Sequence, residues 1–226
     1  MPSFSATTPS SVKAVVFDLD GLMFNTEDVF DLAGRELLRR RGKEMTVGIR
    51  GQMMGRRPSE AFEVLIEELD LRDSVEVLLA ESREIFEELL PERLAPMPGL
   101  YVLLEHIEQV GLPKGIATSS PRNYLEGILG RFDLLERFQM TLAAEDVTQG
   151  KPHPEVYQRA AAEIGVATAD MLVLEDSQAG TQAAAAARAI VVAVPHVHSR
   201  EHDFSEATYV AESLHDPYVL NLLSGG

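Results

Sequence analysis

The sequence predicts an α/β protein in which a parallel sheet carries helices on both faces and a helical segment is inserted early in the chain. Three observations support this fold class. Short apolar runs alternate with segments of helical periodicity along most of the chain. One interval between two such runs is far too long for a single crossover. Acidic, hydroxyl and lysine residues follow the ends of the apolar runs, where α/β proteins bind their ligands.

The first predicted strand covers residues 12–18, a β-branched apolar run that ends in Asp18 and is followed by Asp20 and Gly21. Burying carboxylates is unfavourable by several kcal/mol unless a partner compensates their charge. The pair is therefore expected to face a metal, a substrate or both. A calcium loop of the EF-hand type is disfavoured, because Gly21 falls at its fourth position and that loop needs glycine at the sixth.

The long interval after the first strand is expected to form a domain of its own. Residues 61–69 and 75–86 carry apolar side chains at helical spacing. We therefore predict a helical-bundle domain over residues 28–94. It is inserted in a core domain whose parts are residues 11–27 and 95–226, and the Pro-Met-Pro-Gly run at 96–99 marks the return to the core.

Four further strands and four helices are predicted to alternate through the rest of the chain. The strands are residues 113–119, 139–143, 171–175 and 190–194. The helices are residues 100–109, 124–130, 155–164 and 178–188. This alternation implies a parallel sheet with helices on both faces.

Composition narrows the class of protein. The 226 residues are 45% hydrophobic, which is enough for a substantial core. The absence of cysteine fits a reducing compartment, and we expect a cytoplasmic protein without a signal peptide. No apolar run is long enough for a membrane span. The net charge of -16 argues against a nucleic-acid partner. The sequence does not predict the oligomeric state.

Polar residues at successive strand ends suggest a chemistry. Thr118 and Ser119 end the second strand, Lys151 lies in Gly-Lys-Pro-His-Pro, and Glu175 and Asp176 end the fourth strand. With Asp18 and Asp20, this set fits phosphoryl transfer to a carboxylate. Two anions repel, so Mg²⁺ is expected at the site. A lysine and a hydroxyl can hold the phosphoryl oxygens, and a second acid can protonate the leaving oxygen.

Each of these features also has a structural explanation. Taken alone, the hydroxyls and the acidic pair are typical of helix caps, and Lys151 is typical of a protein surface. Their occurrence at successive strand ends favours a site. Gly150-Lys151 is not a P-loop, since the required glycine and Ser/Thr are missing. The histidines 196, 198 and 202 have a spacing compatible with a metal, but a solvated loop is the favoured interpretation.

The chain resembles phosphohydrolases of the haloacid dehalogenase superfamily that carry a helical cap. The resemblance rests on four motifs in order: Asp-Leu-Asp-Gly-Leu-Met-Phe-Asn-Thr-Glu at 18–27, Ala-Thr-Ser-Ser at 117–120, Gly-Lys-Pro-His-Pro at 150–154 and Leu-Glu-Asp-Ser-Gln-Ala-Gly at 174–180. It implies a Rossmann-like core, a cap domain and an aspartyl-phosphate mechanism. An aspartate at position 20 favours phosphate over haloalkane chemistry in this family.

The resemblance also implies roles for individual residues. Asp18 would be the nucleophile and a metal ligand, and Asp20 would be the acid/base, with its main-chain carbonyl on Mg²⁺. Thr118, Ser119 and Lys151 would bind the phosphoryl group. Asp176 would ligate Mg²⁺, with Glu175 beside it as a direct or indirect partner.

Two kinds of relative compete. The runs at 53–61 and 97–99 resemble small-metabolite phosphatases, including pseudouridine-5′-phosphatase. β-Phosphoglucomutase is the alternative, but it carries a hinge histidine where this chain has Phe30 and a distal-phosphate arginine where it has Pro58. We expect hydrolysis of a small phosphorylated metabolite, such as a sugar phosphate or nucleotide-like compound. The selectivity is expected from the cap, with the arginines 50, 56 and 57 as candidates.

A receiver domain, which is phosphorylated on aspartate without being an enzyme, is the non-enzymatic alternative; it is about half this length and orders its acids differently.

The last core helix departs from the family, which ends it with glycine where this chain has Arg188. Glycine suits a left-handed helix end, and other residues enter that conformation at a cost of roughly 1 kcal/mol.

Overall fold

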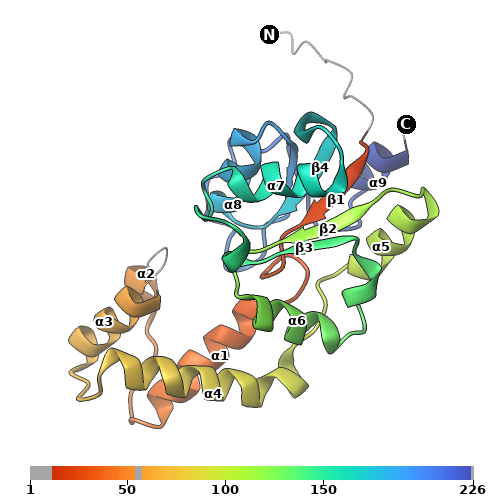
Figure 1. Cartoon of the computed structure of the whole chain (residues 1–226). Helices are drawn as coiled ribbons and strands as arrows, with labels where there is room; N and C mark the ends of the chain where they lie inside the picture. Colours follow the sequence, from red (N-terminus) through yellow and green to blue (C-terminus); the bar gives the residue numbers. More distant parts are fainter. Residues whose placement is uncertain (1–11, 54–57, 225–226) are drawn as a thin grey trace. The chain divides into compact units, whose positions relative to one another are not determined.

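The computed structural model describes residues 12–53 and 58–224, which form two compact units. The core unit contains the described residues up to Phe24 and those from Pro96 onward, and the helical unit is Asn25–Ala95. Figure 1 shows the whole chain coloured along the sequence, so that the residues of each unit can be found with the colour bar. Phe24 and Pro96 form an isolated bridge, so the points at which the chain leaves and re-enters the core unit lie next to each other.

The core unit is built on a six-stranded sheet in which all neighbouring strands are parallel. Its strands are β1 (Ala14–Phe17), β2 (Lys114–Ala117), β3 (Met140–Leu142), β4 (Met171–Glu175), β5 (Ile190–Ala193) and β6 (Tyr209–Val210). Their spatial order is β3-β2-β1-β4-β5-β6. This Rossmann-like arrangement confirms the predicted α/β class.

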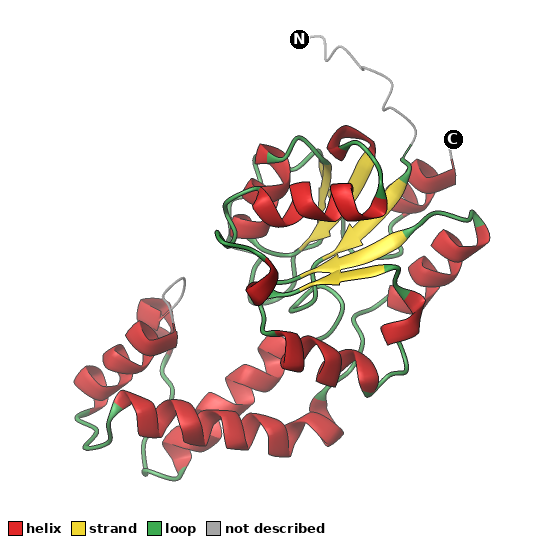
Figure 2. Cartoon of the chain, in the orientation of Figure 1, coloured by secondary structure: helices red, strands yellow, loops and turns green. Residues whose placement is uncertain are grey.

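Helices lie on both faces of the sheet (Figure 2). They are α5 (Leu100–Gln109), α6 (Arg122–Gly130), α7 (Glu155–Ile164), α8 (Gln178–Ala186) and α9 (Pro217–Ser224), with short 3₁₀ turns at Leu135–Arg137, Ala144–Asp146 and Thr168–Asp170. Ala14 and Val16 of β1 pack with residues of α7 and α8 on one face. Val15 and Phe17 point the other way by strand alternation and are equally buried.

The central position of β1 determines where the functional side chains meet. β1 pairs with β2 on one side and with β4 on the other. The register aligns Phe17 with Ile116 and with Leu174, so the three strands end close together. The Asp18 N–H donates to the Leu174 carbonyl at 3.0 Å. Residues that directly follow these strands therefore gather at one edge of the sheet.

The helical unit consists of α1 (Thr26–Arg39), α2 (Val47–Met53), α3 (Pro58–Leu69) and α4 (Val75–Arg93). Its small apolar core includes Leu38, Ile49 and Leu65, one from each of the first three helices. Beyond the end of α1, the Arg41 guanidinium binds Asp73 at 3.0 Å and Glu81 at 2.6 Å. The unit is thus stabilised by this apolar core and by ion pairs from the segment after α1 to α4 and to the turn before α4.

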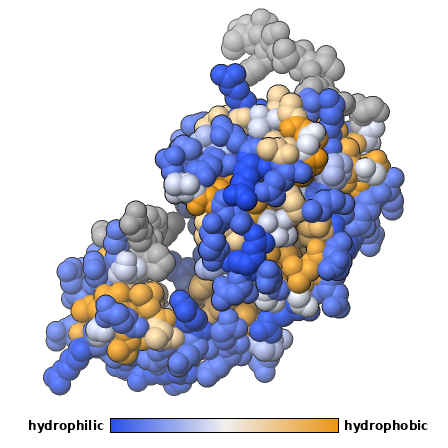
Figure 3. Space-filling view, viewed as in Figure 1, coloured by the Kyte–Doolittle hydropathy of each residue, from blue (hydrophilic) through white to orange (hydrophobic). Residues whose placement is uncertain are grey.

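The surface agrees with the acidic composition. Most of the face seen in Figure 3 is hydrophilic, and apolar patches interrupt it on both units. None of the helices within residues 12–53 and 58–224 combines the length and apolar character that a membrane crossing requires.

Three features near the C-terminus differ from the prediction. β6 has two residues, too few to show an alternating pattern, and α9 was not predicted. The helix predicted over 178–188 ends at Ala186, and Arg188 has a φ of 64°. The N–H groups of Arg188 and Ala189 donate to the carbonyls of Ala185 and Ala184. This is the Schellman arrangement, with arginine in the position that glycine normally occupies.

Candidate active site

Asp18 and Lys151 form a buried ion pair at the carboxyl edge of the sheet. The Lys151 Nζ lies 2.5 Å from Asp18 Oδ1 and 2.6 Å from Glu175 Oε1, and it also donates to the Ala117 carbonyl at 2.9 Å. The Lys151 side chain is 6% exposed and that of Asp18 is 10% exposed. The interpretation of Lys151 as a surface lysine is therefore wrong, because its ammonium binds groups from three strand ends.

The charges in this cluster perturb one another strongly. Burial, reinforced by the carboxylates of Glu175 and Asp176, raises the pKa of Asp18 above its ordinary value despite the nearby lysine. Burial acts to lower the pKa of Lys151, but the Asp18 and Glu175 carboxylates outweigh it and raise that pKa above its ordinary value. One ammonium thus faces an excess of carboxylates, so the cluster can accommodate a further cation.

Glu175 is the most extensively hydrogen-bonded acid of the site. Its Oε1 accepts from Lys151 and from the Tyr157 hydroxyl, each at 2.6 Å. Its Oε2 accepts from the N–H of Asp176 at 3.1 Å and from the N–H and Oγ of Ser177 at 3.3 and 3.0 Å. A carboxylate has about four lone-pair sites, so these donors occupy its capacity. Glu175 therefore orients Lys151 and the start of α8.

Tyr157 was not predicted as a site residue. It lies on the apolar face of α7 and is fully buried. Burial, with the Glu175 carboxylate beside it, raises the pKa of Tyr157, so the hydroxyl keeps its proton and donates. The signal in the sequence is weak: a tyrosine on a buried helical face needs a partner for its hydroxyl, but the sequence does not identify that partner.

Asp20 is held by hydroxyl groups. Its Oδ2 accepts from Ser120 Oγ at 2.6 Å and lies 3.4 Å from Thr118 Oγ1, and its Oδ1 accepts from the Tyr124 hydroxyl at 2.8 Å. Ser119, predicted to bind phosphate, is exposed. Within this motif Ser120 makes a shorter contact to the acid than Thr118 does. The prediction did not select Ser120, and it also missed Tyr124 on α6.

Asp176 pairs with a histidine. The His196 Nε2 lies 2.9 Å from Asp176 Oδ2, and the side chains of the two residues are only 9% and 8% exposed. The expectation of a solvated histidine loop is therefore wrong for His196. It failed because β5 runs beside β4, which brings the loop after β5 against the end of β4.

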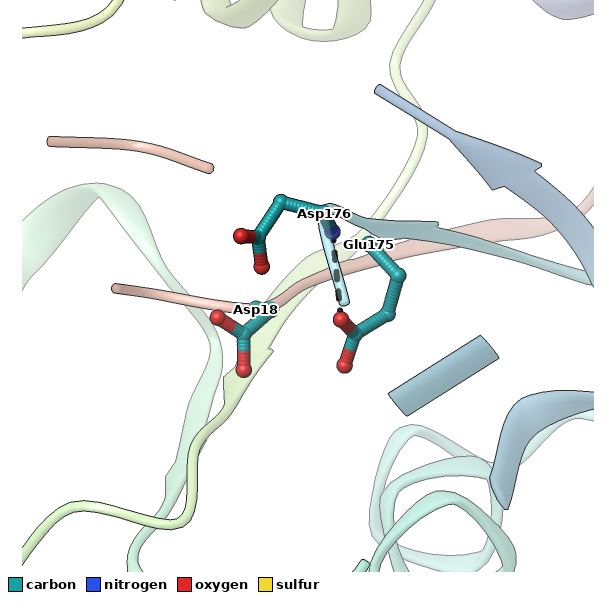
Figure 4. Close-up of side chains that lie close together, drawn as sticks. All are labelled: Asp18, Glu175 and Asp176. Carbon is teal, nitrogen blue, oxygen red and sulfur yellow. Dashed lines mark hydrogen bonds between the residues drawn. The ribbon is translucent and has the colours of Figure 1, made fainter. Parts of the chain in front are cut away.

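The donor set of the site suits a hard divalent cation. Asp18, Glu175 and Asp176 each offer a carboxylate oxygen, and these atoms lie within 4.8 Å of one another. Figure 4 shows the three side chains converging from the ends of β1 and β4. Mg²⁺ takes oxygen ligands and is usually held by one or two carboxylates, with water in its remaining positions. Since the lone pairs of Glu175 are engaged, Asp18 and Asp176 fit better as direct ligands.

The predicted selectivity residues belong to the helical unit. The Arg50 guanidinium pairs with Asp31 of α1, which compensates its charge locally. Arg56 and Arg57 lie outside the described residues. Phe30 stacks on Phe86 with ring centroids 4.1 Å apart. Phe30 thus has an aromatic partner, and its side chain has no polar group with which to donate a hydrogen bond.

Comparison with known proteins agrees with the geometry. Residues 15–194 match the family of haloacid dehalogenase-like hydrolases. A phosphorylated carbohydrates phosphatase of Thermotoga maritima is 32% identical over 180 residues, covering 78% of this chain and 82% of its own. A Drosophila melanogaster protein provisionally named pseudouridine-5′-phosphatase is 32% identical over 207 residues, covering 89% of each.

Solved structures agree as well. The crystal structure of a Thermotoga maritima protein, provisionally named β-phosphoglucomutase, superposes with a TM-score of 0.80 and 27% identity over 95% of this chain and 98% of its own. The sequence relatives are phosphatases, which confirms the expectation of a phosphoric monoester hydrolase over a non-enzymatic receiver domain. With a family match over most of its length and relatives similar over 82% and 89% of their own chains, this chain belongs to the haloacid dehalogenase-like hydrolase family.

Proposed function

We propose that this chain is a Mg²⁺-dependent phosphatase that hydrolyses small phosphate monoesters through a phosphoryl group carried on Asp18. The observation that carries the proposal is the buried cluster of Asp18, Lys151, Glu175 and Asp176, with Asp20 two residues beyond Asp18. The names of the two relatives favour a sugar phosphate or a nucleotide-like metabolite as substrate.

In the first step, a carboxylate oxygen of Asp18 attacks phosphorus and the bond to the leaving oxygen breaks. Asp20 gives its proton to that oxygen. Lys151 neutralises charge on the phosphoryl oxygens, and the Thr118 hydroxyl can donate to them. Mg²⁺ bound by Asp18, Asp176 and the Asp20 carbonyl would offset the repulsion between the substrate and the acids.

In the second step, Asp20 takes a proton from water, and the water oxygen attacks the phosphorus of the aspartyl phosphate. The bond to Asp18 breaks and inorganic phosphate leaves. The hydroxyls of Ser120 and Tyr124 donate to the Asp20 carboxylate and hold it in place. The helical insertion, residues 28–94, is proposed to act as a cap that selects the substrate.

Trapping the intermediate tests the mechanism. Asp20→Asn, incubated with Mg²⁺ and a reactive aryl phosphate and then quenched in acid, should gain one phosphoryl group on the peptide containing Asp18. Asp18→Asn should gain none and should not turn over, while it folds normally by circular dichroism. Normal phosphate release by Asp18→Asn, or phosphorylation of another residue, would remove Asp18 from the mechanism.

The mutase is the second candidate, favoured by the name of the superposed Thermotoga protein. Against it, Phe30 is engaged with Phe86, Pro58 carries no charge, and Arg50 is paired with Asp31. We expect β-glucose 1-phosphate, supplied with Mg²⁺ and catalytic glucose 1,6-bisphosphate, to give mainly free phosphate. Glucose 6-phosphate appearing much faster than free phosphate would favour the mutase.

A further inference from the structure

The loop after β5 places His196 against the proposed metal ligand Asp176. Besides the 2.9 Å contact between Nε2 and Oδ2, the imidazole is nearly enclosed, with 9% of its side chain exposed. The loop itself is well fixed. The His196 N–H donates to Ser199 Oγ at 3.1 Å, the Ser199 N–H donates to the His196 carbonyl at 3.1 Å, and Ser199 is buried.

The other ring nitrogen determines which way the contact to Asp176 runs. The His198 N–H donates to His196 Nδ1 at 3.3 Å. A nitrogen that accepts a hydrogen bond carries no proton, so the ring proton of neutral His196 is on Nε2. His196 therefore donates from Nε2 to the carboxylate of Asp176, and this hydrogen bond can fix the orientation of that carboxylate.

The turn after Asp20 leaves room for this pair. A Cβ at Gly21 would lie 2.6 Å from both His196 Nε2 and Asp176 Oδ2. Gly21 also has a φ of +75°, which glycine adopts most readily. Two segments far apart in sequence, the turn at residue 21 and the loop at residue 196, thus fit together around one hydrogen bond.

We propose that His196 is a positioning residue for divalent-cation binding: it holds the Asp176 carboxylate in the orientation that the cation requires. This inference rests on the proposed Mg²⁺-dependent function. A carboxylate that can rotate must be ordered when it binds a metal, and a buried donor orders it in advance. Loss of a hydrogen-bond partner that orients a metal ligand typically weakens metal binding about 10–100-fold. His196 itself needs no contact with substrate or with the reacting atoms.

Direct metal titration tests the role without turnover. Calorimetric titration of the full chain with MgCl₂, in the absence of substrate, gives the affinity. His196→Phe keeps a ring but has no donor, and His196→Asn keeps an amide that is too short to reach Asp176. Both should bind Mg²⁺ about 10–100-fold more weakly than the wild type. His196→Gln places an amide nitrogen near the position of Nε2 and should restore most of the affinity.

The matched control is His198→Phe, which removes a neighbouring imidazole but retains the main-chain N–H that bonds to His196. It should bind Mg²⁺ like the wild type. Thermal unfolding in EDTA reports whether each variant is folded, and His196→Asn carries the test if His196→Phe does not fold. At saturating Mg²⁺ the kcat of the His196 variants should return towards that of the wild type.

The outcomes separate the two proposals. A wild-type chain that binds no Mg²⁺ would overturn both the metal-dependent function and the role of His196. Wild-type binding with unchanged affinity in His196→Phe and His196→Asn would overturn the role of His196 alone. An equal loss in His198→Phe, or no recovery in His196→Gln, would also overturn it, because the effect would not come from the bond to Asp176.

Discussion

Replacing Gly180 by alanine should disrupt the site from outside the catalytic residues. Gly180 lies in α8, and a Cβ added there would be 1.7 Å from Glu175 Oε1, 1.9 Å from its Cδ and 2.2 Å from its Oε2. No side chain tolerates such contacts, so the Glu175 carboxylate must leave its position. It would then lose its bonds to Lys151, Tyr157, Asp176 and Ser177.

The magnitude follows from what Glu175 holds. Displacing Glu175 removes one partner from a buried ion pair, which is unfavourable by about 3–5 kcal/mol. Alanine is favoured over glycine inside a helix by about 1 kcal/mol. The net expectation for Gly180→Ala is therefore a loss of about 2–4 kcal/mol in the free energy of unfolding, together with most of the turnover, since Lys151 loses one of its two carboxylates.

Gly127 in α6 provides a matched control. A Cβ added at Gly127 meets nothing within 4 Å, so Gly127→Ala should gain about 1 kcal/mol from helix propensity alone and keep its activity. Urea unfolding followed by circular dichroism gives both free energies, and phosphate release gives both activities. If the two variants proved equally stable, the reasoning about Glu175 would be refuted.

Three further predictions address separate parts of the molecule. Arg188→Gly should raise the free energy of unfolding by roughly 1 kcal/mol in urea titrations, because glycine enters the left-handed conformation at 188 without strain. A hydrogen bond from Arg137, with another from Lys114, lowers the pKa of Glu108 to about 2. The stability that wild type has over Glu108→Gln should thus be complete above pH 4.5 and disappear as the pH falls towards 2, as unfolding at each pH can show. Asp20→Asn should slow the release of alkyl leaving groups far more than that of p-nitrophenol, which needs little protonation; equal losses in steady-state assays would contradict its acid/base role.

The sequence predicts the sheet well because its strands are buried on both faces. Residues 171–175 are apolar up to the acid at the end, and the observed β4 has the predicted bounds. The other predicted strands extend one or two residues beyond an observed end, at the amino end, the carboxyl end or both. Short edge elements carry less information: β6 has two residues, and its pairing with β5 depends on how the chain returns after residue 194.

The side chains that support the site were harder to predict than those proposed to act in it. Asp18, Lys151 and Asp176 follow apolar runs or stand in recognisable motifs. Tyr157 and His196 reach the site only through the packing of α7 and of the loop after β5. No local pattern distinguishes a buried tyrosine with a carboxylate partner from one with a main-chain partner. Such contacts depend on the order of the strands, which one sequence read locally does not contain.

The four acids of the site have nearly the same intrinsic chemistry, and their partners distinguish them. Asp18 faces an ammonium, which opposes the rise in pKa that burial causes and so favours the anion that must attack phosphorus. Asp20 faces hydroxyls, which can donate to its anion and accept from its acid, so it can gain and lose a proton in place. Glu175 is fixed by donors on both oxygens and can hold Lys151 without binding substrate. These differences in hydrogen bonding support the division of labour that the proposed mechanism requires.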